Sequence, residues 1–374
     1  MRWLYERFDP ARHGRAELEK LLRRIFHALL VRTDGDVDEA MRWLEVLAER
    51  HQLLPKGYSL EDFRKALERD REVRTDPLTG EFTLTGRGAR EIRRDSLELI
   101  FQGLRKGGAG EHRTPHAGAQ GERLPETRPY EFGDDVAAVD WASTYRNAAM
   151  RRGSESAPGA AGAPGAIEEQ DLEVYETEHR TSCATVLLLD ISHSMTLYGE
   201  DRMSPAKTVA LALDELVTSQ FPKDTLEVVL FGDEAKRVRR EDLPFVSNGP
   251  FHTNTRAGLR MARELLLRSR AANRQIFLIT DGKPSALTEP DGSIYKNPMG
   301  LDRRIVNKTL EEAAECHRKG IPITTFMVAQ DAYLQSFVEE FAKVNQGRVY
   351  FSGLDNLGSY VFVDYLRNRR RRVR

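Results

Sequence analysis

A run of apolar residues in the middle of the chain constrains the fold more than any other feature. Residues 183–190 read CATVLLLD, and Val186 to Leu189 are an unbroken apolar stretch. A strand of this composition is buried on both faces, which is typical of a parallel sheet covered by helices. The strand ends in Asp190, and Ser192 and Ser194 follow at alternate positions. The fold must therefore hold three oxygen-bearing side chains at the end of a buried strand.

Strands and helices alternate from Asp171 to about residue 370. After a lead-in strand at 171–178 and the buried strand, we expect further strands at 226–232, 235–240, 274–280, 322–328 and 348–352. Helices are expected between them, and Ser204 with Pro205 resembles the N-cap and first position of one of these helices. This alternation predicts an α/β domain with a mostly parallel sheet and helices on both faces.

The first part of the chain, residues 1–104, predicts a smaller, mainly helical domain. Apolar residues recur at helical spacing from Leu18 to Leu30, and a second helix is expected over Val37–His51. Ser59 and Asp62 resemble a capping box. A hairpin within 71–88 and a further helix would permit a winged-helix arrangement, but acidic and basic residues alternate there, so nucleic-acid binding is disfavoured.

Two polar stretches rich in glycine, 105–128 and 151–170, predict flexible linkers. The segment 129–150 between them carries too many apolar anchors for a linker, and we expect it to dock on a neighbouring domain. These anchors are Tyr130, Phe132, Val136, Val139, Trp141 and Tyr145. Residues 371–374 belong to a basic tail, which we expect to be solvated.

Composition bounds the remaining possibilities. A formal net charge of −1 gives no overall field toward nucleic acid or an anionic membrane. No stretch resembles a signal peptide or a membrane span. Two cysteines, Cys183 and Cys316, cannot form a disulfide framework. The expected compartment is the cytoplasm.

Three loops are expected to meet at one edge of the sheet, because ligands of open α/β sheets bind beyond the carboxyl ends of the strands. Asp190, Ser192 and Ser194 follow one strand, Asp281 follows another, and Thr253 begins a helix nearby. Two carboxylates and three hydroxyls suit a hard cation such as Mg²⁺ or Mn²⁺. Because the hydroxyls are neutral, the metal would stay electrophilic and bind an external Asp or Glu.

These residues resemble the metal-ion-dependent adhesion site of von Willebrand factor A (vWA) domains. DISHS has the Asp-x-Ser-x-Ser form, Thr253 lies in the middle loop and LITDG supplies Asp281. The resemblance covers about residues 171–370 and implies a Rossmann-like vWA fold. It also implies that the hydroxyls of Ser192, Ser194 and Thr253 contact the metal, while the carboxylates of Asp190 and Asp281 act through water or neighbouring groups.

The segment RPYEFGDDVAAVDW is similar to a stretch in an uncharacterised bacterial family. Such proteins, and bacterial cytosolic vWA proteins, are commonly encoded beside MoxR-type AAA+ ATPases. The resemblance implies a non-enzymatic, metal-dependent adaptor for such an ATPase or its client, in protein assembly or metal insertion. A chelatase-like subunit is a close variant, although the chain has no GxxxxGK[ST] motif.

Other functions stay open at this point. A metal-dependent hydrolase or phosphatase would use Asp190, but such enzymes need a second acid where this chain has Ser192. His193 and His252 flank the site without the spacing of a zinc motif, which favours rim positions. The polar segment 287–300 either forms a lip over the metal or is a plain surface loop. Nucleic-acid binding is the remaining alternative.

Overall fold

The computed structural model describes most of the chain as two compact units. One unit comprises residues 1–109 and 182–374, and the other comprises residues 110–181. The described residues are 14–55, 57–76, 80–106, 122–130, 139–155, 167–178, 182–249, 251–297, 299–329, 331–354 and 356–369.

A six-stranded sheet forms the centre of the first unit. Its strands are, from one edge to the other, β12 (Arg348–Phe351), β11 (Ile323–Met327), β8 (Asn273–Thr280), β5 (Cys183–Asp190), β6 (Thr225–Phe231) and β7 (Ala235–Val238). All neighbouring strands are parallel except the pair β6 and β7, which is antiparallel. The α/β fold predicted from the sequence is confirmed.

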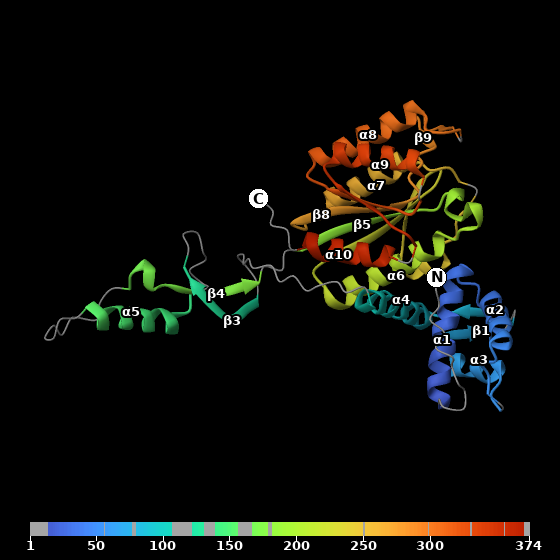
Figure 1. The fold of residues 1–374 in the computed structure, drawn as a ribbon, viewed down its shortest axis with the longest axis horizontal. Helices are drawn as coiled ribbons and strands as arrows, with labels where there is room; N and C mark the ends of the chain where they lie inside the picture. Colours follow the sequence, from blue (N-terminus) through green and yellow to red (C-terminus); the bar gives the residue numbers. More distant parts are fainter. Residues whose placement is uncertain are drawn as a thin grey trace. The chain divides into compact units, whose positions relative to one another are not determined.

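Helices cover both faces of this sheet (Figure 1). They are α6 (Met203–Gln220), α7 (Thr255–Arg268), α8 (Arg303–Arg318), α9 (Ala332–Asn345) and α10 (Leu357–Arg369). α6 and α10 lie on one face, and α7, α8 and α9 lie on the other. Chain order places β6 on one side of β5 and β8 on the other, so the connections diverge at the carboxyl end of β5. Ligand sites of open α/β sheets lie at such a point.

The side chains of β5 alternate between two hydrophobic cores. Val186 and Leu188 pack with α7, α8 and α9, while Leu187 and Leu189 pack with α6 and α10. Every residue of the strand is buried. A one-residue slip would exchange all of these contacts at once, so the register of β5, and with it the position of Asp190, is fixed by packing.

The N-terminal region contains four helices and a hairpin. Their bounds are α1 (Arg15–Arg32), α2 (Val37–Arg50), α3 (Leu60–Arg69), β1 (Val73–Thr75), β2 (Phe82–Leu84) and α4 (Gly86–Lys106). β1 and β2 pair antiparallel. Ser59 and Asp62 form the expected capping box at the start of α3. The helices and the hairpin predicted here are confirmed.

These N-terminal helices share a hydrophobic core with α6 and α10. α4 packs along α6, and Gly358 of α10 lies so close to Ile100 that an added Cβ would fall 2.8 Å from its side chain. The ammonium group of Lys207 on α6 is 1% exposed, and it donates to the carbonyl of Val31 (2.8 Å) and to Asp34 (2.7 Å). The helical region is therefore continuous with the α/β core through both apolar and ionic contacts.

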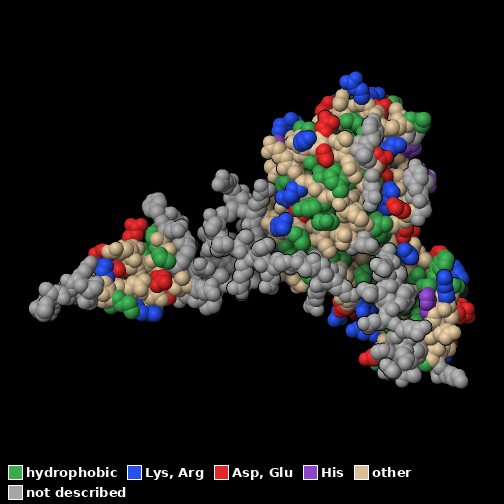
Figure 2. All heavy atoms as spheres, in the orientation of Figure 1, with side chains coloured by type: hydrophobic (Ala, Val, Ile, Leu, Met, Phe, Trp, Pro, Cys, Tyr) green, Lys and Arg blue, Asp and Glu red, His purple; other side chains and the backbone are tan. Residues whose placement is uncertain are grey.

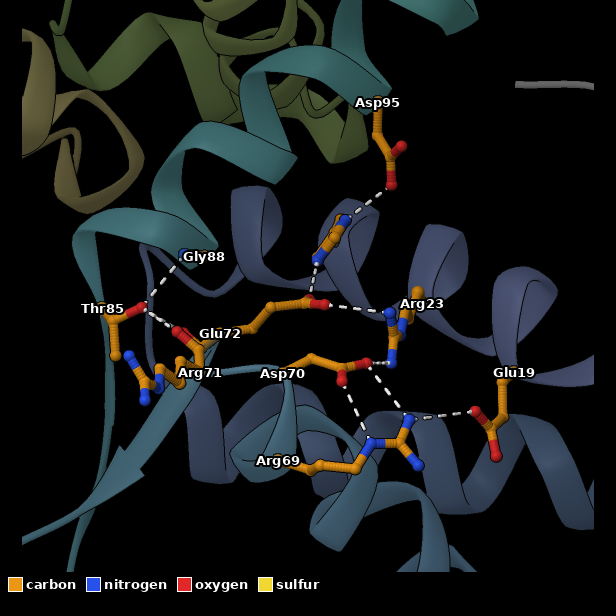
Figure 3. Close-up of polar contacts among 10 residues, drawn as sticks. Glu19, Arg23, Arg69, Asp70, Arg71, Glu72, Thr85, Gly88 and Asp95 are labelled. Carbon is orange, nitrogen blue, oxygen red and sulfur yellow. Dashed lines mark hydrogen bonds and ion pairs between the residues drawn. The ribbon is translucent and has the colours of Figure 1, made fainter. Parts of the chain in front are cut away.

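A buried ionic cluster crosses the N-terminal region (Figure 3). His27 is buried between two carboxylates, with Nδ1 2.6 Å from Asp95 and Nε2 3.0 Å from Glu72. Arg23 contacts Glu72 (3.2 Å) and Asp70. Burial alone would lower the pKa of His27, but the hydrogen bonds and charges of Asp95 and Glu72 outweigh it and raise that pKa. The charged imidazolium is thus the form that this cluster favours.

The second unit contains β3 (Glu122–Pro129), α5 (Trp141–Glu155) and β4 (Glu173–Glu178), with β3 antiparallel to β4. α5 packs beside β4: the hydroxyl of Thr144 accepts from the N–H of Glu173 (3.1 Å), and Arg151 pairs with Asp171 (2.7 Å). The aromatic side chains of Trp141 and Tyr145 are exposed on this helix.

The sequence alone assigned these segments differently. It placed 122–128 in a linker, whereas these residues form most of β3, and it placed 171–178 at the start of the α/β domain, whereas β4 pairs with β3. The pairing joins segments about 50 residues apart in the sequence, so no local sequence pattern predicts it. Most of 105–128, Phe132 and Val136, most of 151–170 and the tail 371–374 lie outside the described residues.

One predicted helix start is wrong. Ser204 was expected to cap α6, but the helix begins at Met203, and the carboxylate of Asp201 accepts from the N–H of Ser204 (2.9 Å). Asp201, three residues upstream of Ser204, thus supplies a side-chain acceptor for an N–H of the first helical turn. Acidic and basic side chains are interspersed over the visible face (Figure 2). Among the described helices, none combines the length and apolar character of a membrane span.

Candidate metal-binding site

Asp190 lies at the buried end of β5, where its carboxylate is 0% exposed. One oxygen, Oδ1, accepts the backbone N–H of Ser192 (2.9 Å). The other, Oδ2, accepts the hydroxyl of Thr280 (2.6 Å), at the end of the neighbouring strand β8. One donor from the loop after β5 and one from the end of β8 fix both oxygens, so the carboxylate has one orientation.

The serine hydroxyls meet directly after the strand. Oγ of Ser192 lies 3.0 Å from Oγ of Ser194. His193 to Gly199 form a 3₁₀ helix with Ser192 as its N-cap. The tight turn, rather than an extended chain, brings the two hydroxyls together.

Asp281 follows β8 and is buried beside Asp190. Burial and, second to it, the negative charge of Asp281 together raise the pKa of Asp190 to about 7, against hydrogen bonds from Ser192 and Thr280 that lower it. The N–H of Lys283 donates to Asp281 (3.2 Å). Gly282, between them, has φ +95°, and a Cβ there would approach Val338 to 3.0 Å. Two buried carboxylates in mutual repulsion are an arrangement that a bound cation would stabilise.

Thr253 is buried in the loop before α7 and is fixed through its backbone. Its N–H donates to the hydroxyl of Ser285 (3.0 Å), and its carbonyl accepts the N–H groups of Ser285 (2.9 Å) and Ala286 (3.2 Å). The N–H of His193 donates to the carbonyl of Phe251 (3.1 Å). These bonds join the middle loop both to the serine loop and to the segment after β8.

The five predicted residues are thus gathered at one sheet edge, by different means. Hydrogen bonds connect Asp190 with Ser192, and Ser192 with Ser194. The charge of Asp281 is close enough to raise the pKa of Asp190. Backbone hydrogen bonds fix the position of Thr253.

Two supporting residues, Thr280 and Ser285, are not among those predicted from the sequence. Thr280 is the polar residue that ends the apolar run of β8 and could have been found on that ground.

The side chains at this edge offer oxygen atoms as ligands for a metal. Among the described residues, no group of three or more His, Cys, Asp and Glu side chains is arranged to hold an ion. A metal at this edge would rely on hydroxyl oxygens and water beside two carboxylates, a donor set that suits Mg²⁺ or Mn²⁺. The residues present fit the hard cation expected from the sequence.

The two histidines near the site lie on its rim. His193 is exposed, and His252 is half-buried. The backbone N–H of His252 donates to Asp233 (2.9 Å), and the ring Nδ1 of His252 lies 3.4 Å from the same carboxylate. Lys296 pairs with Asp233 from the other side (2.6 Å). It belongs to the hairpin β9 (Ala286–Thr288) and β10 (Ile294–Lys296), which is the predicted excursion beside the site.

Comparison with known proteins identifies the class of this domain. The profile described as "Rv0959-like protein, vWA domain" matches residues 183–366, and "Rv0959-like protein, third domain" matches residues 122–177. The chain therefore carries a vWA domain, preceded by a segment similar to the third domain of Rv0959-like proteins.

Individual proteins are also similar to this chain. The chain is 32% identical over 365 residues to the uncharacterized proteins Rv0959 of Mycobacterium tuberculosis (strain H37Rv) and Mb0984 of Mycobacterium bovis. The match covers 95% of this chain and 52% of each relative, so the chain spans about half the length of these proteins. Among solved structures, the vWF domain of the pili tip protein Mfa5 from Porphyromonas gingivalis is 14% identical, with a TM-score of 0.40, covering 52% of this chain and 99% of that one.

Proposed function

We propose that the chain is a non-enzymatic adaptor that binds a partner protein through a metal ion. The ion, Mg²⁺ or Mn²⁺, would be held by the hydroxyls of Ser192, Ser194 and Thr253. Asp190 and Asp281 would balance its charge. A carboxylate from an Asp or Glu of the partner would complete the coordination.

The observation that carries this proposal is the pair of buried carboxylates beside converging hydroxyls. Asp190 is fully buried, its pKa is raised to about 7, and Asp281 lies close enough to contribute to that shift. Burying two like charges is costly unless a cation compensates them. Because a hard cation keeps several waters when few carboxylates reach it, the site leaves room for an external ligand.

The partner follows from the family resemblance rather than from the geometry. We propose a MoxR-type AAA+ ATPase or its client, acting in assembly of, or metal insertion into, another protein. The cytoplasm is the proposed compartment. A phosphatase role is disfavoured because Ser192 stands where a second acid would be needed, and because both oxygens of Asp190 already accept hydrogen bonds. Nucleic-acid binding finds no support in the interspersed surface charges.

A pull-down tests the proposal. The wild-type chain and the double variant Ser192→Ala/Ser194→Ala are immobilised and exposed to lysate of the source organism, each in Mg²⁺ and in EDTA. Ser219→Ala is the matched control, because Ser219 is an exposed serine on α6 whose hydroxyl bonds only its own helix. A partner retained by wild type and by the control, in Mg²⁺ alone, supports the proposal. Equal recovery in every sample contradicts it.

A further inference from the structure

An exposed aromatic side chain, Phe251, stands on the rim of the candidate metal site. It is 39% exposed, although it is a large apolar residue. Its carbonyl accepts the N–H of His193, which lies between the two serines of the site. Thr253, the third hydroxyl, lies two residues further along the chain. The ring therefore belongs to the loop that supplies the site and is tied to the loop opposite.

Two glycines hold this ring in place. A Cβ at Gly249 would lie 2.4 Å from the ring of Phe251, and a Cβ at Gly232 would lie 2.8 Å from its Cβ and 3.0 Å from the ring. Neither glycine has a positive φ that would itself require glycine. Their lack of a side chain is therefore explained by the close approach of the ring to the backbone. The ring is therefore a partly exposed platform that packs against the backbone at Gly249 and Gly232.

The charges near this platform are compatible with an acidic ligand. Asp233, a carboxylate in the turn between β6 and β7, pairs with Lys296 (2.6 Å) and accepts the backbone N–H of His252 (2.9 Å). Burial would raise the pKa of Asp233, but these contacts lower it, so it stays ionised and neutralised by its partners. The charge of Asp233 is thus already balanced by its partners. A carboxylate of a partner protein that approaches the site therefore meets less repulsion from Asp233.

From this geometry we infer that the metal edge recognises an acidic residue that has a large apolar side chain within two positions of it. The inference rests on the proposed function, because the acidic residue would bind the metal. The apolar side chain would cover Phe251. Aromatic residues at the centre of an interface contribute strongly when a partner desolvates them, and a single acid on a metal gives little selectivity by itself. Phe251 would therefore determine which acidic segments bind.

Selection from a random peptide library tests the inference. Phage-displayed random peptides are bound to the full chain in Mg²⁺ and eluted with EDTA. The chains compared are wild type, Phe251→Ala, Leu267→Ala and Ser192→Ala/Ser194→Ala. Leu267 is the matched control, because it is an apolar residue of equal exposure (40%) in the last turn of α7, far along the helix that follows the site.

Wild type and Leu267→Ala are expected to enrich an acidic residue with an aromatic or large aliphatic neighbour. Phe251→Ala should enrich the acidic residue alone. A selected peptide whose apolar residue is changed to alanine should bind wild type roughly tenfold more weakly. This inference is overturned, and the proposed function is left intact, in either of two cases. The first is that Phe251→Ala still selects peptides with an apolar residue beside the acid. The second is that wild type selects acidic residues without apolar neighbours. Enrichment that is absent, or unchanged in the double serine variant, overturns both.

Discussion

The energetic cost of Asp190 in the metal-free protein gives a quantitative prediction. Its pKa is raised from 3.8 to about 7, first by burial and then by Asp281. Because the folded-state pKa exceeds the unfolded value, stability is fully present below pH 3.8 and is lost as the pH rises through about 7. A shift of about three pKa units corresponds to roughly 4 kcal/mol, which is an upper bound for this buried, interacting group.

The substitution Asp190→Asn removes the charge and keeps the shape of the side chain. Its carbonyl can still accept the N–H of Ser192, and its amide can donate to Thr280. In EDTA near pH 8, we expect the variant to be more stable than wild type by up to ~4 kcal/mol. Near pH 5 the advantage should shrink to under ~2 kcal/mol, because the folded wild-type carboxyl is then protonated. Magnesium should narrow the difference near pH 8, since it stabilises only wild type, by ~2.7 kcal/mol at a hundredfold excess over Kd.

The assay is urea unfolding followed by far-ultraviolet circular dichroism, at both pH values, in EDTA and in MgCl₂. Asp242→Asn is a control, because Asp242 pairs only with its neighbour Arg239 on the surface. If Asp190→Asn proves less stable than wild type by the same amount at both pH values in EDTA, Asp190 carries no uncompensated charge. The reasoning that links its burial to a cation would then be refuted.

Three further predictions follow from other contacts. Asp34→Asn should lower the free energy of unfolding by about 1–3 kcal/mol, because it leaves buried Lys207 without its counter-ion; chemical denaturation measures this, and an unchanged stability contradicts the pairing. Because the pKa of His27 is raised above 6.5, its contribution to the stability of the fold is complete below pH 6.5 and is lost as the pH rises further. His27→Gln should therefore flatten the fall of the melting temperature with pH above 6.5. An unaltered slope would refute the stabilising role of the charged imidazolium. Wild type should hydrolyse p-nitrophenyl phosphate in Mg²⁺ no faster than Asp190→Asn does; metal-dependent turnover lost in the variant would establish an enzyme.

The α/β unit could be predicted closely from the sequence because its signals are local. The apolar run of β5, the helical repeats and the turn at Asp291 each define an element within a few residues. The position of the site follows from the same information, since parallel strands end at one edge. The alternation of Val186 and Leu187 between two cores fixes the register that places Asp190.

Features that depend on distant partners could not be predicted in this way. β3 is recognisable only through its pairing with β4, about 50 residues later. The contact of Lys207 with Val31 and Asp34 joins residues more than 170 positions apart, and no motif marks it. Thr280 supports Asp190 across the sheet, which becomes visible only when the two strand ends are neighbours.

Calorimetric titration of MgCl₂ and MnCl₂ into the chain tests the central claim most directly. Wild type, Ser219→Ala, Asp281→Asn and Ser192→Ala/Ser194→Ala are compared at one pH. We predict saturable binding of one ion per chain in wild type and in the Ser219 control, and its loss in the other two variants. Absent binding in wild type, or equal binding in all four proteins, would contradict a metal site formed by these residues.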